Sequence, residues 1–161
     1  MFDFDIGDKI VYPLHGAGII EAIEEHEVLG KGQTYYILKL LTDRMRVMVP
    51  TSSVERIKLR GVIQGNEVSK VIEVLTNEVI AEDYSSDWRA RYANNLDKMK
   101  SGCIYKVAEV AKNLSLRHKI RGLSSTEKKL FDNAFSMIVS ELSFAKEISV
   151  QEVTTMIEKI L

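Results

Sequence analysis

The residues that form turns are concentrated in the first part of this 161-residue chain. Both prolines and seven of the nine glycines lie within residues 1–65. Because glycine and proline interrupt helices and favour turns, this distribution predicts a turn-rich β domain followed by a domain that is compatible with long helices. We place the boundary within the last glycine-containing stretch of the first part, which gives an N-terminal domain of residues 1–62 and a C-terminal domain of residues 63–161.

Short runs of β-branched and aromatic residues predict the strands of the first domain. The runs cover residues 10–12, 18–25, 34–41 and 44–49. We expect Gly30-Lys31-Gly32 to form a hairpin loop and Thr42-Asp43 to form a tight turn. Together these elements predict a small barrel or a curled antiparallel sheet.

Alternation within the last run assigns its side chains to the two faces of a strand. Met45, Val47 and Val49 fall on one face, which we expect to be the core. Arg46 and Met48 fall on the opposite, solvent-facing side. An apolar Met48 on that side is either a partly covered surface residue or a contact with a partner, because methionine adapts well to partner surfaces.

Apolar residues spaced three and four apart predict four or five helices beyond residue 65. The first covers about residues 66–76, and Asn77–Ser86 is expected to be a connector. A helix over residues 88–100 follows, with Ser86 or Asp87 as its N-cap. Two further helix starts carry the spacing of a capping box, at Ser124 with Glu127 and at Ser149 with Glu152.

The formal charge of −1 conceals a strong segregation of charge along the chain. Residues 87–130 hold eleven Lys and Arg against four Asp and Glu, a formal charge of +7, and the segments on either side are net acidic. A basic block of this kind indicates either a polyanionic partner or a solvated helix face. The near-neutral total excludes a protein that coats DNA through bulk charge, but it is compatible with a local basic face.

The only tryptophan, Trp88, begins the helix predicted over residues 88–100, and arginines lie beside it. Lysine and arginine suit contacts with phosphates, and an aromatic ring can wedge against unstacked bases. Tyr92, Leu96 and Met99 recur on the same helical face as Trp88, so burial in the core is the alternative interpretation.

The residue types needed for catalysis or metal binding do not converge in this sequence. The three histidines are far apart, and neither His-Glu-x-x-His nor Cys-x-x-Cys spacing occurs. The single cysteine, Cys103, excludes a disulfide framework and has no base among its sequence neighbours. We therefore expect no enzymatic activity, no metal, no cofactor and no small-molecule ligand. Neither a signal peptide nor a stretch of membrane-spanning length is visible, so we expect a soluble, cytoplasmic protein.

Two groups of motifs, one in each predicted domain, resemble a known family. The first is Gly7-Asp8-Lys9-Ile10-Val11-Tyr12-Pro13 followed by His15-Gly16-Ala17-Gly18. The second comprises Trp88 with Arg91-Tyr92, Asn95-Leu96, Ser101-Gly102, Lys106-Val107-Ala108-Glu109-Val110, Arg121-Gly122-Leu123-Ser124 and Glu127-Lys128. In order and spacing they resemble the CarD/CdnL family of bacterial transcription regulators over nearly the whole chain. The first motif alone also resembles the RNA polymerase-interacting module of transcription-repair coupling factors.

The resemblance implies a function for each domain. It implies that the N-terminal domain is Tudor-like and binds a lobe of the RNA polymerase β subunit. The helical domain would contact promoter DNA in the minor groove at the upstream edge of the transcription bubble, without strong sequence specificity, and a Trp wedge would hinder bubble collapse. The matching polymerase-binding residues are His26, Val28, Arg46 and Met48, and the matching DNA-binding residues are Trp88, Arg91, Arg117, Lys128 and Lys129.

Some positions differ from the family pattern. His26 and Met48 stand where relatives often carry arginine, so we expect a polymerase surface with less charge and more apolar contact. Ala90 and Ala93 stand where relatives can be basic, which would weaken contact with DNA. We expect a regulator that stabilises the promoter open complex and associates with the nucleoid through the polymerase. The alternative is a protein–protein interaction module that binds the polymerase without touching DNA.

Overall fold

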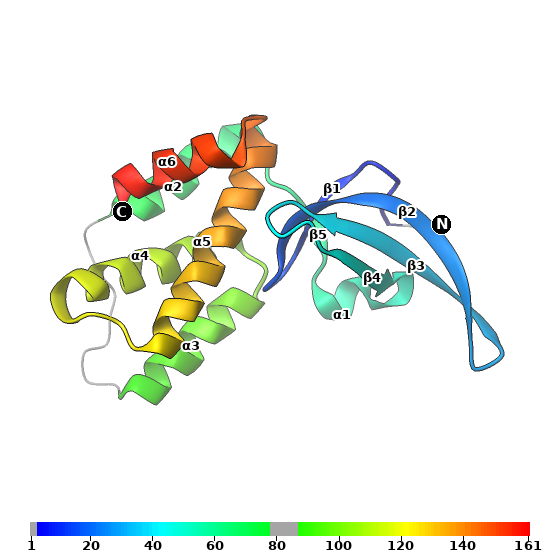
Figure 1. The fold of residues 1–161 in the computed structure, drawn as a ribbon, viewed down its shortest axis with the longest axis horizontal. Helices are drawn as coiled ribbons and strands as arrows, with labels where there is room; N and C mark the ends of the chain where they lie inside the picture. The colour runs from blue at the N-terminus through cyan, green and yellow to red at the C-terminus, as the bar shows by residue number, and fades with distance from the viewer. Residues whose placement is uncertain (1–2, 78–86) are drawn as a thin grey trace.

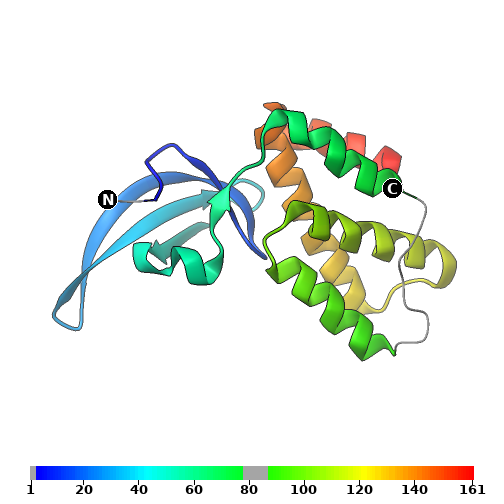
Figure 2. The same ribbon diagram turned by 180° about the vertical axis from the view of Figure 1, so that it is seen from behind.

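The computed structural model describes residues 3–77 and 87–161. In its first part an antiparallel sheet curls around a small core, and helices make up the rest of the described chain (Figures 1 and 2). This arrangement confirms the predicted α+β class, a curled antiparallel sheet followed by an all-helical part. Apart from Asn77, the connector predicted over Asn77–Ser86 lies outside the described residues.

The sheet has five strands among the described residues, in the order β4-β3-β2-β1-β5. They are β1 (Lys9–Tyr12), β2 (Gly16–Val28), β3 (Lys31–Leu40), β4 (Arg46–Pro50) and β5 (Arg60–Gly61). A bulge between Ile20 and Ala22 interrupts the pairing of β2 with β3, and such bulges increase local twist. The short helix α1 (Val54–Ile57) adds Val54 and Ile57 to the apolar core of the sheet.

The hairpin between β2 and β3 turns more tightly than predicted. Val28 pairs with Lys31, so the turn consists of Leu29 and Gly30 alone, and Lys31 and Gly32 belong to β3. Leu29 and Gly30 have φ angles of 52° and 79°. A two-residue turn with positive φ at both positions matches the right-handed twist of the strands it joins, which explains why the turn is short.

The connection between β3 and β4 is longer than the predicted two-residue turn. It covers residues 41–45, and Arg44 within it has a φ of 55°. Met45 therefore precedes the strand and is 56% exposed, so its assignment to the core is wrong. Val47 and Val49 do pack in the core of the sheet, as alternation predicts.

Five helices follow the sheet within the described residues. They are α2 (Val68–Thr76), α3 (Trp88–Lys100), α4 (Ile104–Arg121), α5 (Ser125–Lys146) and α6 (Val150–Ile160). Helix α3 has the bounds predicted from the sequence, and Asp87 caps it by accepting a hydrogen bond from the Ala90 N–H at 2.9 Å. Ser124 and Ser149 cap α5 and α6 as predicted.

Helix α5 is the central element of the helical part. It contacts α2, α3, α4 and α6, and it also contacts strand β2 of the sheet. Ala134, Ile138 and Leu142 recur along it at four-residue spacing and are fully buried in the helical core. One helix thus runs from the far end of the helical part to the sheet (Figure 1).

Candidate functional site

The four residues predicted to bind polymerase lie on one face of the sheet. Strand register places Met48 opposite Ile37 and Ile37 opposite Ala22, and His26 and Val28 share the face of Ala22 because side chains alternate along β2. Arg46 shares the face of Met48 in the same way. This outer face, carrying His26, Val28, Arg46 and Met48, is opposite the core face formed by Tyr36 and Val49.

The outer face combines charged and apolar groups. Met48 is 50% exposed and Val28 is 45% exposed. The Arg46 Nε lies 3.0 Å from a Glu21 carboxylate oxygen, so part of its charge is balanced within the sheet. His26 Nε2 lies 2.9 Å from Glu24 Oε2, and its ring meets the Tyr35 ring edge-on with centroids 5.7 Å apart. The face therefore offers apolar contact beside polar groups that already have partners.

Strand β4 is an edge of the sheet. Among the described strands it pairs only with β3, and it carries both Arg46 and Met48. An edge strand presents backbone N–H and C=O groups that a partner strand can pair with. In both ribbon views the short helix α1 lies beside β4, and the longer helices α2–α6 lie on the other side of the sheet's β1 and β5 strands (Figures 1 and 2).

Sequence reasoning missed the tip of the hairpin. Leu29 is 99% exposed there, at the end of a two-stranded ribbon formed by the far halves of β2 and β3. Its positive φ is unfavourable for a residue with a branched side chain. The signal in the sequence was a leucine beside Gly30 in a segment already expected to turn.

Trp88 lies on the surface of the helical part. It is 57% exposed in the first turn of α3, and the Arg89 guanidinium carbon lies 5.6 Å from the centroid of its ring. Tyr92 and Leu96 pack against the helical core and Met99 is fully buried in it. The apolar face of α3 therefore begins one turn after Trp88, and the alternative interpretation, burial of Trp88 in the core, is wrong.

The predicted DNA-binding cations differ in exposure. Lys128 and Lys129 are exposed in the first turns of α5, whereas Arg91 is partly buried and Arg117 is largely buried. The Arg117 Nε lies 3.5 Å from a Glu127 carboxylate oxygen, and both side chains are largely buried. This ion pair joins α4 to the start of α5, so the structure gives Arg117 a role in packing these two helices.

These residues gather at one end of the helical part. Both ribbon views show the starts of α3 and α5 and the end of α4 at the end that lies away from the sheet (Figures 1 and 2). We call this region the basic end and define it by Trp88, Arg91, Arg117, Lys128 and Lys129. The outer face of the sheet and the basic end are thus separate surfaces of the chain.

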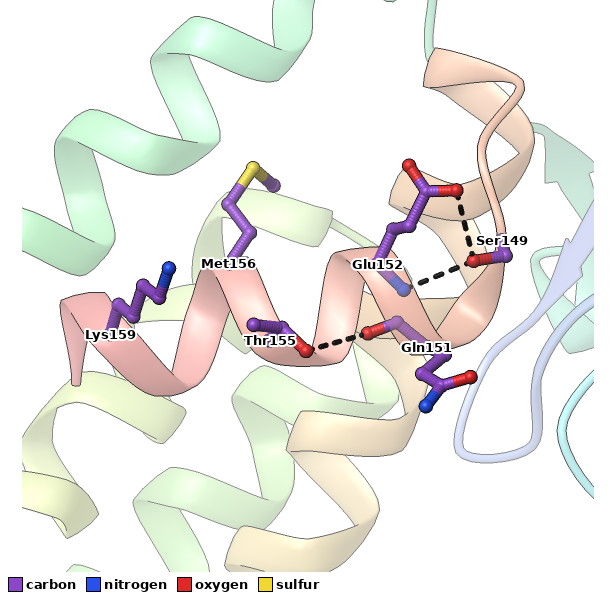
Figure 3. A pocket seen from close by; sticks show the side chains of 6 residues that line it. All are labelled: Ser149, Gln151, Glu152, Thr155, Met156 and Lys159. Atoms are coloured by element: carbon purple, nitrogen blue, oxygen red, sulfur yellow. Dashed lines mark hydrogen bonds between the residues drawn. The ribbon is translucent and has the colours of Figure 1, made fainter.

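Three surface hollows are found among the described residues. One hollow of about 610 Å³ lies along α6 (Figure 3). Polar groups in its lining form hydrogen bonds within the helix and its cap: the Ser149 hydroxyl oxygen accepts from the Glu152 N–H, and the Thr155 hydroxyl donates to the Gln151 carbonyl. A second, of about 340 Å³, lies at the basic end and is lined by Ser115, His118, Leu123, Lys128, Phe131 and Asp132. Over residues 3–77 and 87–161 no cluster of three His, Cys, Asp or Glu side chains could hold a metal.

The third hollow, of about 460 Å³, lies between β5 and the start of α4. The Tyr105 hydroxyl at its edge donates to a Glu67 carboxylate oxygen at 3.4 Å. Desolvation raises the pKa of Tyr105 above its ordinary value, and the nearby Glu67 charge raises it further. Within the described part of the chain, no helix is both long enough and apolar enough to span a membrane.

Comparisons with known proteins match both parts of the chain. Residues 4–63 match the CarD-like/TRCF RID domain, and residues 70–158 match the CarD C-terminal domain. A putative transcription factor of Bacillus subtilis (strain 168), YdeB, is 39% identical over 150 residues, which are 93% of this chain and 97% of the relative. A solved structure described as CdnLNt from Myxococcus xanthus is 41% identical, covers 39% of this chain and 89% of its own, and superposes with a TM-score of 0.34.

Proposed function

We propose that this chain holds promoter DNA open while it is bound to RNA polymerase. The proposal proceeds from the family: the chain belongs to the CarD/CdnL family of RNA polymerase-binding transcription regulators. Residues 1–62 would dock on the polymerase β subunit through the outer face of the sheet. Residues 63–161 would present the basic end to the minor groove at the upstream edge of the bubble.

The exposed position of Trp88 is the observation that carries this proposal. A large aromatic ring on the surface loses the stabilisation that burial would give, and Trp88 is 57% exposed beside the Arg89 guanidinium. An apolar wedge inserted at an unstacked base step opposes re-stacking, which is worth a few kcal/mol per step. Trp88 would therefore slow collapse of the bubble rather than read a sequence.

Docking on the polymerase removes the need for strong binding to DNA. The chain has a formal charge of −1, and its positive charge is confined to residues 87–130. Binding to the polymerase raises the effective concentration of the basic end at the promoter, so a modest intrinsic affinity suffices. Exposed Lys128 and Lys129 would contact phosphates, and Arg91 and Arg117, which are less exposed, would border the same surface.

The test compares Trp88→Ala with the parent chain on promoter open complexes. We expect the variant to bind polymerase normally and to shorten the open-complex lifetime about tenfold relative to the parent, the kinetic equivalent of about 1.4 kcal/mol. Ile6→Ala is the matched control, because Ile6 is also a large apolar residue and is 62% exposed, but lies in the first part of the chain.

Two results would contradict the proposal. An unchanged open-complex lifetime with Trp88→Ala would exclude Trp88 as a wedge. The chain would then be an interaction module that binds polymerase without touching DNA. A loss of polymerase binding with Trp88→Ala would show that Trp88 contacts the polymerase and not DNA.

A further inference from the structure

A carboxylate is buried where the sheet meets the helical part. Glu141 of α5 is 1% exposed. Its two oxygens accept hydrogen bonds from both terminal nitrogens of Arg60, at 2.6 and 2.7 Å, and one of them also accepts from the Ile63 N–H at 2.9 Å. Arg60 belongs to β5 and Ile63 lies just beyond it, so Glu141 binds the end of the sheet at three points.

Arg60 extends this network to a third segment. Its Nε donates to the Gly102 carbonyl, and Gly102 lies in the short turn between α3 and α4. Gly102 has a φ of 77°, and a Cβ built there would lie 3.2 Å from Pro13 of the β1–β2 turn. The turn that ends α3 is therefore held against the sheet by a directional hydrogen bond and by a close backbone approach.

A second polar link lies one residue earlier on α5. Ser140 is fully buried, and its hydroxyl oxygen accepts a hydrogen bond from the Ala17 N–H at 2.9 Å. The same hydroxyl donates to the Met137 carbonyl at 2.9 Å, so both of its hydrogen-bonding roles are used. Ser140 and Glu141 thus attach α5 to two strands that are far apart in the sequence, β2 and β5.

Buried charges are a poor way to gain stability alone. Removing a carboxylate and a guanidinium from water costs free energy that their attraction only partly restores, and apolar residues of similar volume often serve as well. Hydrogen bonds differ from apolar contact because they specify direction, and a bidentate arginine–carboxylate pair specifies it in a plane. The Arg60–Glu141 pair is therefore suited to setting an orientation.

We propose that Arg60 and Glu141 are positioning residues that set the direction of α3, and hence the place of Trp88, relative to the outer face of the sheet. Arg60 holds the turn at the C-terminal end of α3, and Trp88 lies at the other end of that 13-residue helix. An error in angle at the turn is magnified over a helix about 20 Å long. This inference rests on the proposed function, in which polymerase binds the sheet and DNA meets Trp88.

The first experiment measures geometry in the free protein. Spin labels at Lys39→Cys on β3 and Asn94→Cys on α3, in a Cys103→Ser background, report the distance between the two parts by pulsed electron resonance. Both label sites are exposed, and serine is favoured at the N-cap position that Cys103 occupies. We expect one narrow distance distribution in this background and a distribution at least twice as wide with Glu141→Gln, because an amide cannot accept at all three donors.

Glu109→Gln is the matched control. Glu109 pairs with Lys98 at 3.2 Å, but that pair lies within the helical part and is half-exposed, so its loss should leave the distribution narrow. Arg60→Lys serves as a second variant should Glu141→Gln fail to fold, because lysine keeps the charge and loses the fork that reaches both Glu141 and Gly102. A distribution that stays narrow in every folded variant would overturn the proposal.

The second experiment places these variants on the polymerase. We expect Glu141→Gln to keep polymerase affinity within twofold of the parent and to shorten the open-complex lifetime. The open-complex lifetime of the Glu141→Gln, Trp88→Ala double variant should be no shorter than that of Trp88→Ala alone, because both changes act on the same contact between Trp88 and DNA. Additive losses would overturn the positioning role. If Trp88→Ala leaves the open-complex lifetime unchanged, the proposed function fails. The distance measurement in the free protein then still tests whether Arg60 and Glu141 set the direction of α3.

Discussion

Met48 and Met45 allow the outer face of the sheet to be tested one side chain at a time. They lie three residues apart and are 50% and 56% exposed, but alternation along β4 points only Met48 to the outer face. We expect Met48→Glu to weaken binding to RNA polymerase about tenfold or more, because it places a charge in an apolar contact. Met45→Glu adds the same charge and should bind normally. Equal losses in a direct binding assay would show that charge alone matters.

Leu29 carries a strain that a single substitution should relieve. Its φ of 52° places it in the left-handed region, where asparagine is tolerated far better than leucine. Its side chain is fully exposed, so replacement forfeits no burial. We expect Leu29→Asn to raise the free energy of unfolding by about 1 kcal/mol, measured by denaturant titration. Lys31→Asn, at a neighbouring exposed strand position, should give no gain, and a matching gain there would point to a general effect of asparagine.

At the scale of elements, the cap of α3 links local stability to Trp88. The Asp87 carboxylate accepts from the Ala90 N–H at 2.9 Å, and Trp88 lies in the turn that this bond closes. Losing such a cap costs about 1 kcal/mol and frays the first turn. We expect Asp87→Ala to shorten the open-complex lifetime, and Asp87→Ser to restore it.

The matched control for that prediction is Ser149→Ala. Ser149 caps α6 in the same way, with its hydroxyl oxygen 3.1 Å from the Glu152 N–H, but α6 carries none of the residues of the basic end. Its loss should lower the melting temperature by a similar amount and leave the lifetime unchanged. A shortened lifetime in both variants would mean that overall stability governs the effect.

Elements whose signals are local could be predicted from the sequence. The caps at Asp87, Ser124 and Ser149 depend on residues within three positions, and all three are present. The prediction of Met45 as a core residue was wrong because it extended the alternation of the strand back to residue 44. Arg44 has a positive φ, so the chain is still in a turn there. Such a backbone state depends on how neighbouring strands pair, which residue type alone does not specify.

Which side chains are exposed and which are buried near each candidate surface was harder to predict. Trp88 continues an apolar helical spacing, so periodicity alone favoured burial, and the resemblance to a family pointed to the surface instead. The contact of Glu141 with Arg60 was missed because the two residues are 81 positions apart in the sequence. Its one local signal is an acidic residue inside the buried stripe between Ile138 and Leu142.

At the scale of the whole molecule, α5 connects the two surfaces. Lys128 and Lys129 lie in its first turns at the basic end, and Ser140 and Glu141 attach its later turns to the sheet. Thirteen residues separate Lys128 from Glu141, about 20 Å along the helix. In the proposed function, a rigid helix of this length would transmit the position of a docked sheet to the end that would meet DNA.

The segregation of charge makes the last prediction specific to place. Each phosphate contact removed should reduce the slope of log affinity against log salt by about 0.9 for duplex DNA. We expect Lys128→Ala with Lys129→Ala to lower that slope by about 2 for the full chain on forked promoter DNA. Lys146→Ala with Lys70→Ala removes the same charge from the opposite end of α5 and from the first turn of α2, where the side chains are also exposed. That control should keep the parent slope, because screened charges act only near the DNA. Equal slopes in the two double variants would show that total charge governs binding and that the basic end is not the DNA-contacting surface.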